Sequence, residues 1–569
     1  MTVGDFLFPP ALVLLGGAIF VGLFPYKLRS SFTLIVCLFA LAVTLLLPEG
    51  RYATFTLMKY KLLLLSVDKL SKLFGIIFSL ITTLGWVFSF HVKETGENRA
   101  ALLYGAGALG VTFAGDYLTL FFFWELMALS STFLIWAVRT EESEKAGMRY
   151  LIMHLVGGGL LLTGIIYTFL STGSMAITKF TTTDNLSAWL ILLGVGVNAA
   201  FIPLHAWLPD SYPKATVTGA VFLSALTTKA AVYVLLRVFA GWEILIYMGV
   251  VMALYGVFYA VLANDIREIL AYHIISQVGY MVAGAGIGTD LAINGAAAHA
   301  FSHILYKALL FMGAGAVIQA TGKSKLTELG GLIKNQRAIF ILYMVGAFSI
   351  SGFPLFNGFI SKSIVVAAAG AAHHSTVELL LYLAAVGTLL HTALKLPYYT
   401  WYGENKAPRS LPIPNNMYVA MALTAFLCLF YGIFPNTLYQ LLPYPLNFRP
   451  YTAYHLTETA QLTIFTFVAF WLFRKFVAGE AGITLDTDWF YRYPAPWLKK
   501  LFLTDLERLF NAADERINDG VKLLAKFGEN PLTWGKEYNP HLYRPPLGLS
   551  IILVILCFIV LALGGFFLV

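Results

Sequence analysis

The chain has little charge, few cysteines and no cofactor motif. Only 12% of its 569 residues are charged, about half the share in soluble proteins, which excludes an ordinary soluble enzyme. Cys37, Cys428 and Cys557 are too few and too scattered for an iron–sulfur site or a disulfide framework. No quinone, flavin, nucleotide or metal motif is visible, and Gly157-Gly-Gly159 lies in an apolar run that suits close helix packing. The sequence therefore predicts no cofactor, no metal and no catalytic residue of its own.

Long apolar runs are abundant instead, and 59% of the residues are hydrophobic. A helix needs about 20 apolar residues to cross a bilayer. The chain contains about 16 such runs, which predicts an all-α polytopic membrane protein. The expected spans are 6–25, 31–47, 67–91, 100–115, 117–138, 150–170, 187–206, 216–240, 244–263, 269–288, 292–319, 337–371, 377–400, 415–434, 459–478 and 547–568.

Basic residues gather in the loops that follow odd-numbered spans. A net charge of +8 would suggest nucleic acid in a soluble protein, but here it is a topology signal. The 48–66 loop, with Arg51, Lys59 and Lys61, is the exception. The positive-inside rule places the odd-numbered loops in the cytoplasm and both termini outside. We expect the protein to lie in the inner (cytoplasmic) membrane of a cell. The basic residues of the odd-numbered loops are Lys27, Arg29, Lys93, Arg99, Lys145, Arg149, Lys214, Arg267, Lys323, Lys325, Lys334, Arg337, Lys406 and Arg409.

A polar linker, 479–546, precedes the final span at 547–569. Apolar residues recur in it at spacings of three and four, which predicts an amphipathic helix of roughly 30 residues, or about 45 Å. We expect this lateral helix to lie along the cytoplasmic face, against lipid or a neighbouring subunit. Its apolar positions are Leu498, Phe502, Leu506, Leu509, Phe510, Ala513, Ile517, Val521 and Leu524.

Three ionisable side chains stand at helical spacing inside the apolar run 292–318. His299, His303 and Lys307 are four residues apart, so a helix stacks them on one face. Each costs ~2.5–3.5 kcal/mol at bilayer depth, which indicates a wet internal path for protons or ions. Two histidines on one helix face cannot hold both sides of a haem.

Two spans contain helix breakers. Pro203 and Pro209 interrupt one, and Gly352 and Pro354 interrupt another. Freed backbone groups at membrane depth are tolerated only where protein or a water-filled cavity satisfies them. Paired breaks about 150 residues apart predict two inverted five-helix repeats with the ion site between them.

Five more ionisable residues fall within apolar spans. Glu125 is expected to pair with Lys229, and Lys362 follows the second break. His391 and Lys395 would extend the row toward the far side of the membrane. Structural ion pairs are the alternative for the carboxylate and lysines, and Lys395 has the further alternative of reaching the cytoplasmic interface.

Several motifs, taken in order, resemble the antiporter-like subunits of respiratory complex I, of Mrp cation/proton antiporters and of membrane-bound hydrogenases, in particular the D-type Mrp subunit. The resemblance covers about residues 60–435 and implies a fourteen-helix core with two inverted repeats. The motifs are Trp124-Glu125-Leu-Met, Pro203-Leu-His-Ala-Trp-Leu-Pro-Asp210, Ala271-Tyr-His-Ile-Ile-Ser-Gln-Val-Gly-Tyr280, His303-Ile-Leu-Tyr-Lys307-Ala-Leu-Leu-Phe and Gly358-Phe-Ile-Ser-Lys362.

The resemblance assigns roles to residues. Glu125 matches the carboxylate of the first half, Lys229 the bridging basic residue, and Lys362 the terminal lysine. His299, His303 and Lys307 match the central proton relay. Asn198 departs from the pattern, because these subunits usually carry a lysine there that pairs with the carboxylate. Asparagine carries no proton at physiological pH, so either Lys229 replaces that partner or the first half-channel is weakened.

We therefore expect a proton-translocating subunit, with Na⁺ as a candidate exchange ion, in an Mrp-type antiporter or complex I-related assembly with other membrane subunits. Whether it belongs to an ion-translocating oxidoreductase stays open. The alternatives are a non-pumping coupling subunit, as in a carbon-uptake complex, and a stand-alone metabolite transporter. The expected parts are 1–99 (N-terminal helices), 100–240 and 241–400 (the two repeats), 401–478 (additional spans), 479–546 (linker) and 547–569 (final span).

Overall fold

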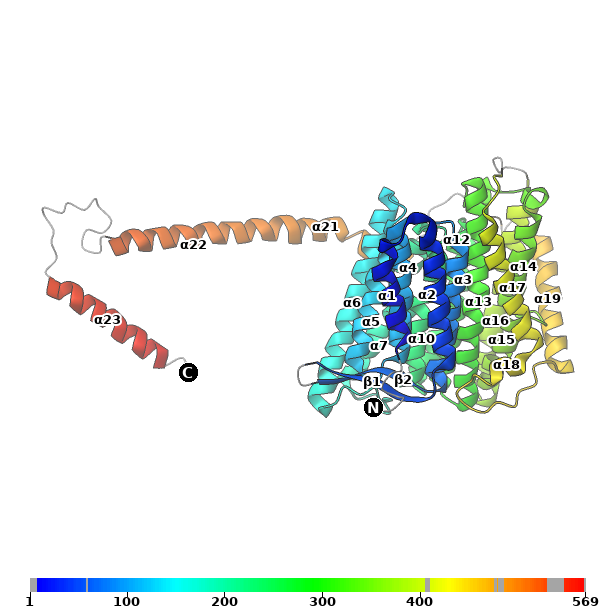
Figure 1. Ribbon diagram of the computed structural model, residues 1–569, viewed down its shortest axis with the longest axis horizontal. Helices are drawn as coiled ribbons and strands as arrows, with labels where there is room; N and C mark the ends of the chain where they lie inside the picture. Colours follow the sequence, from blue (N-terminus) through cyan, green and yellow to red (C-terminus); the bar gives the residue numbers. More distant parts are fainter. Residues whose placement is uncertain are drawn as a thin grey trace. The chain divides into compact units, whose positions relative to one another are not determined.

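The computed structural model describes residues 8–57, 60–404, 410–474, 478, 486–529 and 547–566. These residues form two compact units, Met1–Asp488 and Trp489–Val569. The first unit is a bundle of roughly parallel and antiparallel helices (Figure 1). Eleven of the described helices are long and apolar enough to cross a membrane, and four more apolar helices are shorter.

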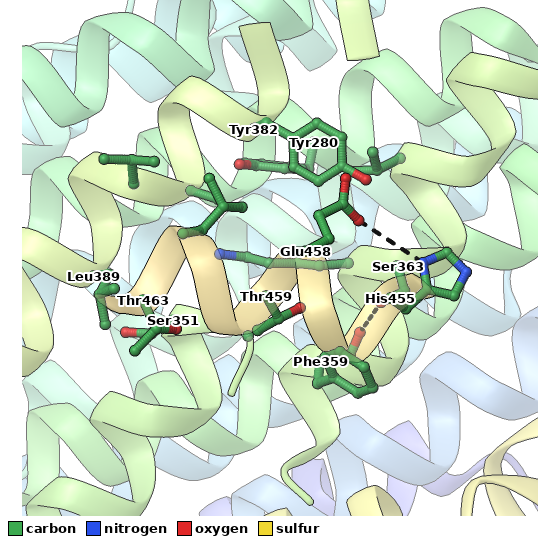
Figure 2. A pocket seen from close by; sticks show the side chains of 16 residues that line it. Tyr280, Ser351, Phe359, Ser363, Tyr382, Leu389, His455, Glu458, Thr459 and Thr463 are labelled. Atoms are coloured by element: carbon green, nitrogen blue, oxygen red, sulfur yellow. Dashed lines mark hydrogen bonds and ion pairs between the residues drawn. The ribbon is translucent and has the colours of Figure 1, made fainter. Parts of the chain in front are cut away.

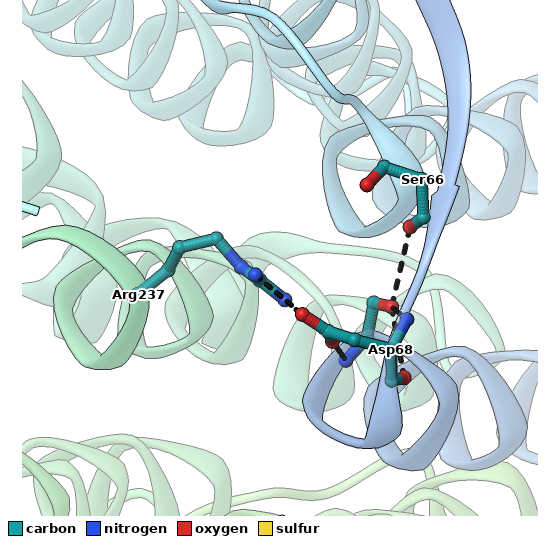
Figure 3. A network of polar contacts seen from close by, with 4 residues as sticks. Ser66, Asp68 and Arg237 are labelled. Carbon is teal, nitrogen blue, oxygen red and sulfur yellow. Dashed lines mark hydrogen bonds and ion pairs between the residues drawn. The ribbon is translucent and has the colours of Figure 1, made fainter. Parts of the chain in front are cut away.

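The N-terminal part contains α1 (Pro10–Phe20), α2 (Tyr26–Leu46) and α3 (Lys69–Phe88). The expected loop at 48–66 is instead an antiparallel hairpin of β1 (Gly50–Leu57) and β2 (Tyr60–Val67), at one end of the bundle (Figure 1). Asp68 follows β2, accepts the Ser71 N–H as the N-cap of α3, and binds Arg237 through two contacts of 2.6 and 2.7 Å (Figure 3). This ion pair joins the hairpin and α3 to a helix 169 residues further along the chain.

The first repeat contains five elements in order. They are α4 (Thr95–Phe113), α5 (Tyr117–Trp136), α6 (Glu141–Thr172), the broken helix of α7 (Leu186–Ala199) and α8 (Trp207–Ser211), and the pair α9 (Gly219–Ala225) and α10 (Thr227–Val238). Side-chain caps begin several of these helices: Asp116 accepts the Thr119 N–H at α5, and Thr140 with Ser143 forms a capping box at α6.

The second repeat has the same order. It contains α11 (Glu243–Leu262), α12 (Ile266–Ile287), α13 (Asp290–Thr321), the broken helix of α14 (Arg337–Ser351) and α15 (Asn357–Ala371), and α16 (Ser375–Leu389). The third helix has 32 residues in both repeats, and the fourth has 14 residues before its break in one and 15 in the other. If each of the five elements crosses the membrane once, the second repeat enters from the opposite face, as the predicted inverted arrangement requires.

The remaining elements follow the repeats. α17 (Asn415–Ile433), α18 (Pro435–Tyr439) and α19 (Ala453–Phe473) complete the first unit. The second unit contains α20 (Trp489–Arg492), α21 (Ala495–Lys499), α22 (Leu506–Glu529) and α23 (Leu547–Phe566). The predicted amphipathic helix is confirmed as α22, extended by a π-helical stretch, Lys500–Asp505. Its position along the membrane stays a prediction.

The all-α polytopic fold is confirmed. Each of the sixteen predicted spans falls on a helix or on a pair of helix segments, although the number of crossings itself stays a prediction. α12 and α13 lie at the centre, with 100% and 94% of their apolar windows buried. Gly249, Gly256 and Gly279 bring α11 and α12 into backbone contact, since a Cβ at any of them would overlap the facing main chain.

Candidate functional site

The first break lies where the two prolines predict it. α7 ends at Ala199, Ala200 is left-handed with φ 61°, and the helix resumes at Trp207, whose indole N–H donates to Val197 O at 2.9 Å. Pro203 lies in the gap and Pro209 within α8. Asn198, on the last turn of α7, is fully buried, and neither amide atom has a hydrogen-bond partner in the protein.

The second break has the same design. α14 ends at Ser351, Gly352 is left-handed with φ 76°, and α15 begins at Asn357, with Pro354 between them. The left-handed conformation explains the glycine at 352. The break leaves C-terminal carbonyls of α14 without helical partners. Lys362, one turn into α15, donates its Nζ–H to one of them, Ile350 O, at 2.6 Å.

A third interruption lies inside the eighth span, which we expected to be continuous. The helix is distorted at Leu226, between α9 and α10. The Thr227 N–H donates to Tyr104 Oη on α4 at 3.0 Å. Lys229 Nζ donates to Ser224 O at 2.5 Å, so the distortion supplies the partner of this fully buried lysine.

Lys395 is held in a similar way. α16 continues as a π-helical turn, Leu390–Lys395, that contains both His391 and Lys395. Lys395 Nζ donates to Val261 O at 2.6 Å and to Ala263 O at 3.3 Å, at the C-terminus of α11. The ammonium group is buried. Isolated π-turns in α-helices occur frequently at functional sites.

Three of the predicted lysines therefore share one environment. Lys229, Lys362 and Lys395 each place the ammonium group on carbonyls at a helix C-terminus. That end of a helix carries a partial negative charge, so it stabilises a cation inside an apolar bundle.

Lys307 differs from the other three. It lies on α13 with His299 and His303, and all three side chains are fully buried. Lys307 Nζ and both ring nitrogens of His303 have no hydrogen-bond partner among the residues that the structure describes. Buried polar groups are nearly always paired with protein or water. These atoms therefore need a partner from outside the chain, and water is the one that fits.

His299 connects this helix to the second break. Its Nδ1 lies 3.0 Å from Ser361 Oγ, the residue before Lys362. The Lys362 ammonium lies 5.3 Å from the ring centroid of Tyr280, and that ring lies 5.6 Å from the ring of His299. The structure thus brings His299 and Lys362 together around Tyr280.

His391 meets a histidine that the sequence does not place in the row. Its ring lies 5.3 Å from that of His273 on α12, and neither histidine has a hydrogen-bond partner in the protein. His154, by contrast, packs on Tyr150 and has its Nδ1 2.8 Å from Tyr150 O. His273 is therefore a natural member of the buried row, whereas His154 is tied to its own helix.

Glu125 is not paired with Lys229 in the part of the chain that the structure describes. It lies half-buried on α5 against Gly158 of α6, and its Oε1 has no hydrogen-bond partner. The Lys229 ammonium instead donates to Ser224 O, a carbonyl at the end of α9 five residues earlier on the same distorted span. Glu125 Oε1 and both amide atoms of Asn198 are among the buried polar atoms of the first repeat that have no hydrogen-bond partner among the described residues.

A further cluster joins the linker to the first break. His205 Nε2 lies 3.1 Å from Asp486 Oδ1, and Tyr255 and Tyr272 each donate a hydroxyl to this carboxylate at 2.6 Å. Burial alone would raise the pKa of Asp486, but His205 and the two hydroxyls outweigh it and lower the pKa to about 2. His205 belongs to a motif visible in the sequence, whereas nothing in the polar linker singles out Asp486.

The arrangement suits the movement of protons or small cations. Basic side chains, imidazoles and hydroxyls extend from Lys395 to Lys362, and many of their polar atoms need water. Among the described residues, no group of three or more histidine, cysteine or acidic side chains could hold a metal ion.

Comparisons with known proteins agree with this geometry. Residues 114–389 match the family described as NADH:quinone oxidoreductase/Mrp antiporter, TM. The chain is 33% identical over 321 residues to the D-type Na⁺/H⁺ antiporter subunit of Alkalihalophilus pseudofirmus, covering 53% of this chain and 64% of that protein, which is just under two thirds of the relative's length. It is 30% identical over 356 residues to an uncharacterised protein of Methanocaldococcus jannaschii, covering 58% of this chain and 73% of that protein.

A solved structure shows the same fold. A chain of the Mrp complex from Dietzia superposes with a TM-score of 0.69 at 22% identity, over 82% of this chain and 99% of that one. The family match, the two relatives and the paired breaks lead to one conclusion. The chain belongs to the NADH:quinone oxidoreductase/Mrp antiporter transmembrane family.

Proposed function

We propose that this chain is an ion-translocating membrane subunit of a multisubunit complex, and that it moves protons, in exchange for Na⁺, along its buried basic row. One observation carries the proposal. Between the two breaks, Lys307 and His303 are fully buried and have no protein partner for their side-chain nitrogens. An ammonium group that is both dry and unpaired costs several kcal/mol, so a row of such groups is retained for use.

The charges of the row act on one another. Two ammonium groups in an interior of low dielectric repel strongly, so a proton that arrives on one favours departure from the next. The helix-end carbonyls at Lys229, Lys362 and Lys395 provide three resting positions for a positive charge. Lys307, which has no such carbonyl, is the residue through which charge passes between the two repeats, 100–240 and 241–400.

We propose that the first repeat provides the ligands for Na⁺. The carboxylate of Glu125 and the amide of Asn198 provide oxygen atoms, the ligands that hard cations prefer. The relative in Alkalihalophilus pseudofirmus is named as a component of an Na⁺/H⁺ antiporter. Exchange of Na⁺ for H⁺ is therefore the form of transport that we propose for this chain.

The energy source lies in other subunits, since the sequence contains no redox or nucleotide motif. We propose that the chain works in the cell membrane beside other membrane subunits, as the superposition on a chain of the Mrp complex supports.

Replacement of Lys307 by methionine tests this function, because methionine keeps the bulk of the side chain and removes its charge. In the complex reconstituted in vesicles, we expect Lys307→Met to abolish proton movement and to leave assembly intact. Lys334→Ala, an exposed loop lysine, is the control and should keep wild-type transport.

A non-pumping coupling subunit is the second candidate. It is favoured by Asn198, where the resembling subunits have lysine, and by the unpaired Glu125. Unchanged activity of the complex with Lys307→Met would select this candidate and reject transport through the row.

A further inference from the structure

A cavity of about 60 Å³ lies between α12, α15, α16 and α19, beside the second break. A cavity needs ~10–15 Å³ of such space to hold a water, so this one has room for water. Figure 2 shows Glu458 extending from α19 toward the side of the cavity that Tyr280 and Tyr382 line. Lys362, the predicted terminal lysine, lines the same cavity.

Helix α19 has a polar face and an apolar face, and its polar face lines this cavity. Its polar residues recur at helical spacing and line the cavity: His455, Glu458, Thr459 and Thr463. Its other face is apolar and exposed in the chain, as at Ile464, Phe465, Val468 and Trp471. Glu458 therefore faces the cavity and not the exposed side of the helix.

No strong ion pair accounts for Glu458. Its Oε2 lies 3.9 Å from His455 Nδ1, beyond hydrogen-bond distance. The side chains stay partly exposed, 24% for Glu458 and 20% for His455. Tyr382 of α16 lines the cavity beside the carboxylate, and its hydroxyl cannot neutralise that charge. The carboxylate therefore remains available to water and to an ion that enters the cavity.

The loop charges give the cavity a direction. They place the end of α15 and the start of α19 on the outer side of the membrane. His455 and Glu458 lie on the first turns of α19, whereas Lys362 lies next to the second break. The cavity thus extends from the buried row toward the outer surface.

We propose that this cavity is the outer aqueous path of Lys362 and that Glu458 is the carboxylate that exchanges protons with it. The N–H bond of the Lys362 ammonium breaks, the proton passes through water, and an O–H bond forms on Glu458. This leaves a neutral amine and a carboxylic acid. Glu458 then releases the proton to the outer side, with His455 beside it at the mouth. The proposal rests on the proposed proton transport.

Access to the cavity is tested first, because it does not depend on transport. In a Cys557→Ser chain within the intact complex, Thr463→Cys should react with a charged, membrane-impermeant thiol reagent added from the outer side. Thiols react as thiolates, which form in water and not in lipid. Ile464→Cys, the next residue on the lipid-exposed face of the same helix, should not react.

The role of the carboxylate is tested by Glu458→Gln. We expect proton movement in reconstituted vesicles to fall by about tenfold or more, since a proton-transfer group is removed. Glu378→Gln is the matched control, because Glu378 lies in the first turn of α16 and does not line the cavity. It should keep wild-type rates.

The outcomes separate the two proposals. An unreactive Thr463→Cys in a transporting complex would overturn the aqueous path alone. A reactive Thr463→Cys with wild-type transport in Glu458→Gln would overturn the role of Glu458. Failure of the unmodified complex to move protons would contradict the proposed function, and with it the proton exchange between Lys362 and Glu458.

Discussion

His205 Nε2 lies 3.1 Å from Asp486 Oδ1, and both side chains are buried. His205 belongs to the first break and Asp486 to the chain that follows α19, so 281 residues separate two groups in direct contact. Thr487, the next residue, donates its hydroxyl to Pro203 O in the same break, at 3.0 Å. The beginning of the linker is therefore anchored at a site where the helix backbone is open.

Removal of this anchor should destabilise the first unit. Loss of the carboxylate leaves the His205 ring and two tyrosine hydroxyls without their buried partner, at a cost of about 1–3 kcal/mol for each group left unsatisfied. We expect Asp486→Ala to lower the thermal unfolding midpoint in detergent. Asp514→Ala, an exposed residue of α22, should leave the midpoint unchanged. Equal midpoints for Asp486→Ala and the wild type would show that the contact contributes nothing.

Asp486 should make the free energy of unfolding depend on pH in the acid range. Its pKa is lowered from 3.8 to about 2 in the folded chain. A lowered carboxyl pKa means that the stabilisation is fully present above pH 3.8 and is lost as the pH falls through about 2. An infrared titration should show the Asp486 carboxylate, identified by its absence in Asp486→Asn, still ionised at pH 3.8. A protonated group at that pH would contradict the described contacts.

Two adjacent glycines should behave oppositely. A Cβ at Gly158 would overlap Glu125 Oε1, whereas a Cβ at Gly159 would meet nothing within 4 Å. We expect Gly158→Ala to displace the carboxylate and to reduce transport at little cost in stability, because the atom that the Cβ would meet is the end of a flexible side chain. Gly159→Ala should be neutral or stabilise the helix by ~1 kcal/mol. Transport rates and unfolding midpoints of the two variants test this prediction. Equal values for both variants would show that Glu125 does not contact Gly158.

Asn198 gives a gain-of-function test. If the missing lysine weakens the first half-channel, Asn198→Lys should increase proton movement in the reconstituted complex, because it places a protonatable group at the fully buried position. Asn198→Met has similar bulk without charge and should not increase it. A rate in Asn198→Lys that matches Asn198→Met would show that the asparagine is not the limiting feature.

Breaks and spans could be predicted from the sequence because they depend on local chemistry. Proline and glycine are helix breakers, so the local sequence at Pro203 and Gly352 predicts the two breaks. Apolar length alone locates most spans. The distortion at Leu226 could not be predicted, since no proline or glycine marks it and its cause is a hydroxyl of Tyr104 about 120 residues earlier. The hairpin within the 48–66 loop was not predicted, and the apolar run of β2 at 62–65 shows no alternation of polar and apolar residues.

In the site, too, the residue types could be predicted from the sequence, whereas their partners could not. The residue types at Lys229, Lys307 and Lys362 identify a buried row, but their partners are carbonyls that only the folded chain brings near. The expected contact of Glu125 with Lys229 is absent among the described residues, and the ammonium lies instead on Ser224 O. Asp486 and Glu458 are single acidic residues, and their roles depend on the elements that face them, which the sequence does not show.

The central claim is that water reaches the basic side chains between the two breaks, and a high-resolution map of the intact complex tests it most directly. The account predicts ordered waters within hydrogen-bond distance of Lys307 Nζ and of the His303 ring nitrogens, continuous with the cavity at Lys362. A map that shows this interior dry, with apolar side chains packed against Lys307 and no water at either residue, would contradict it.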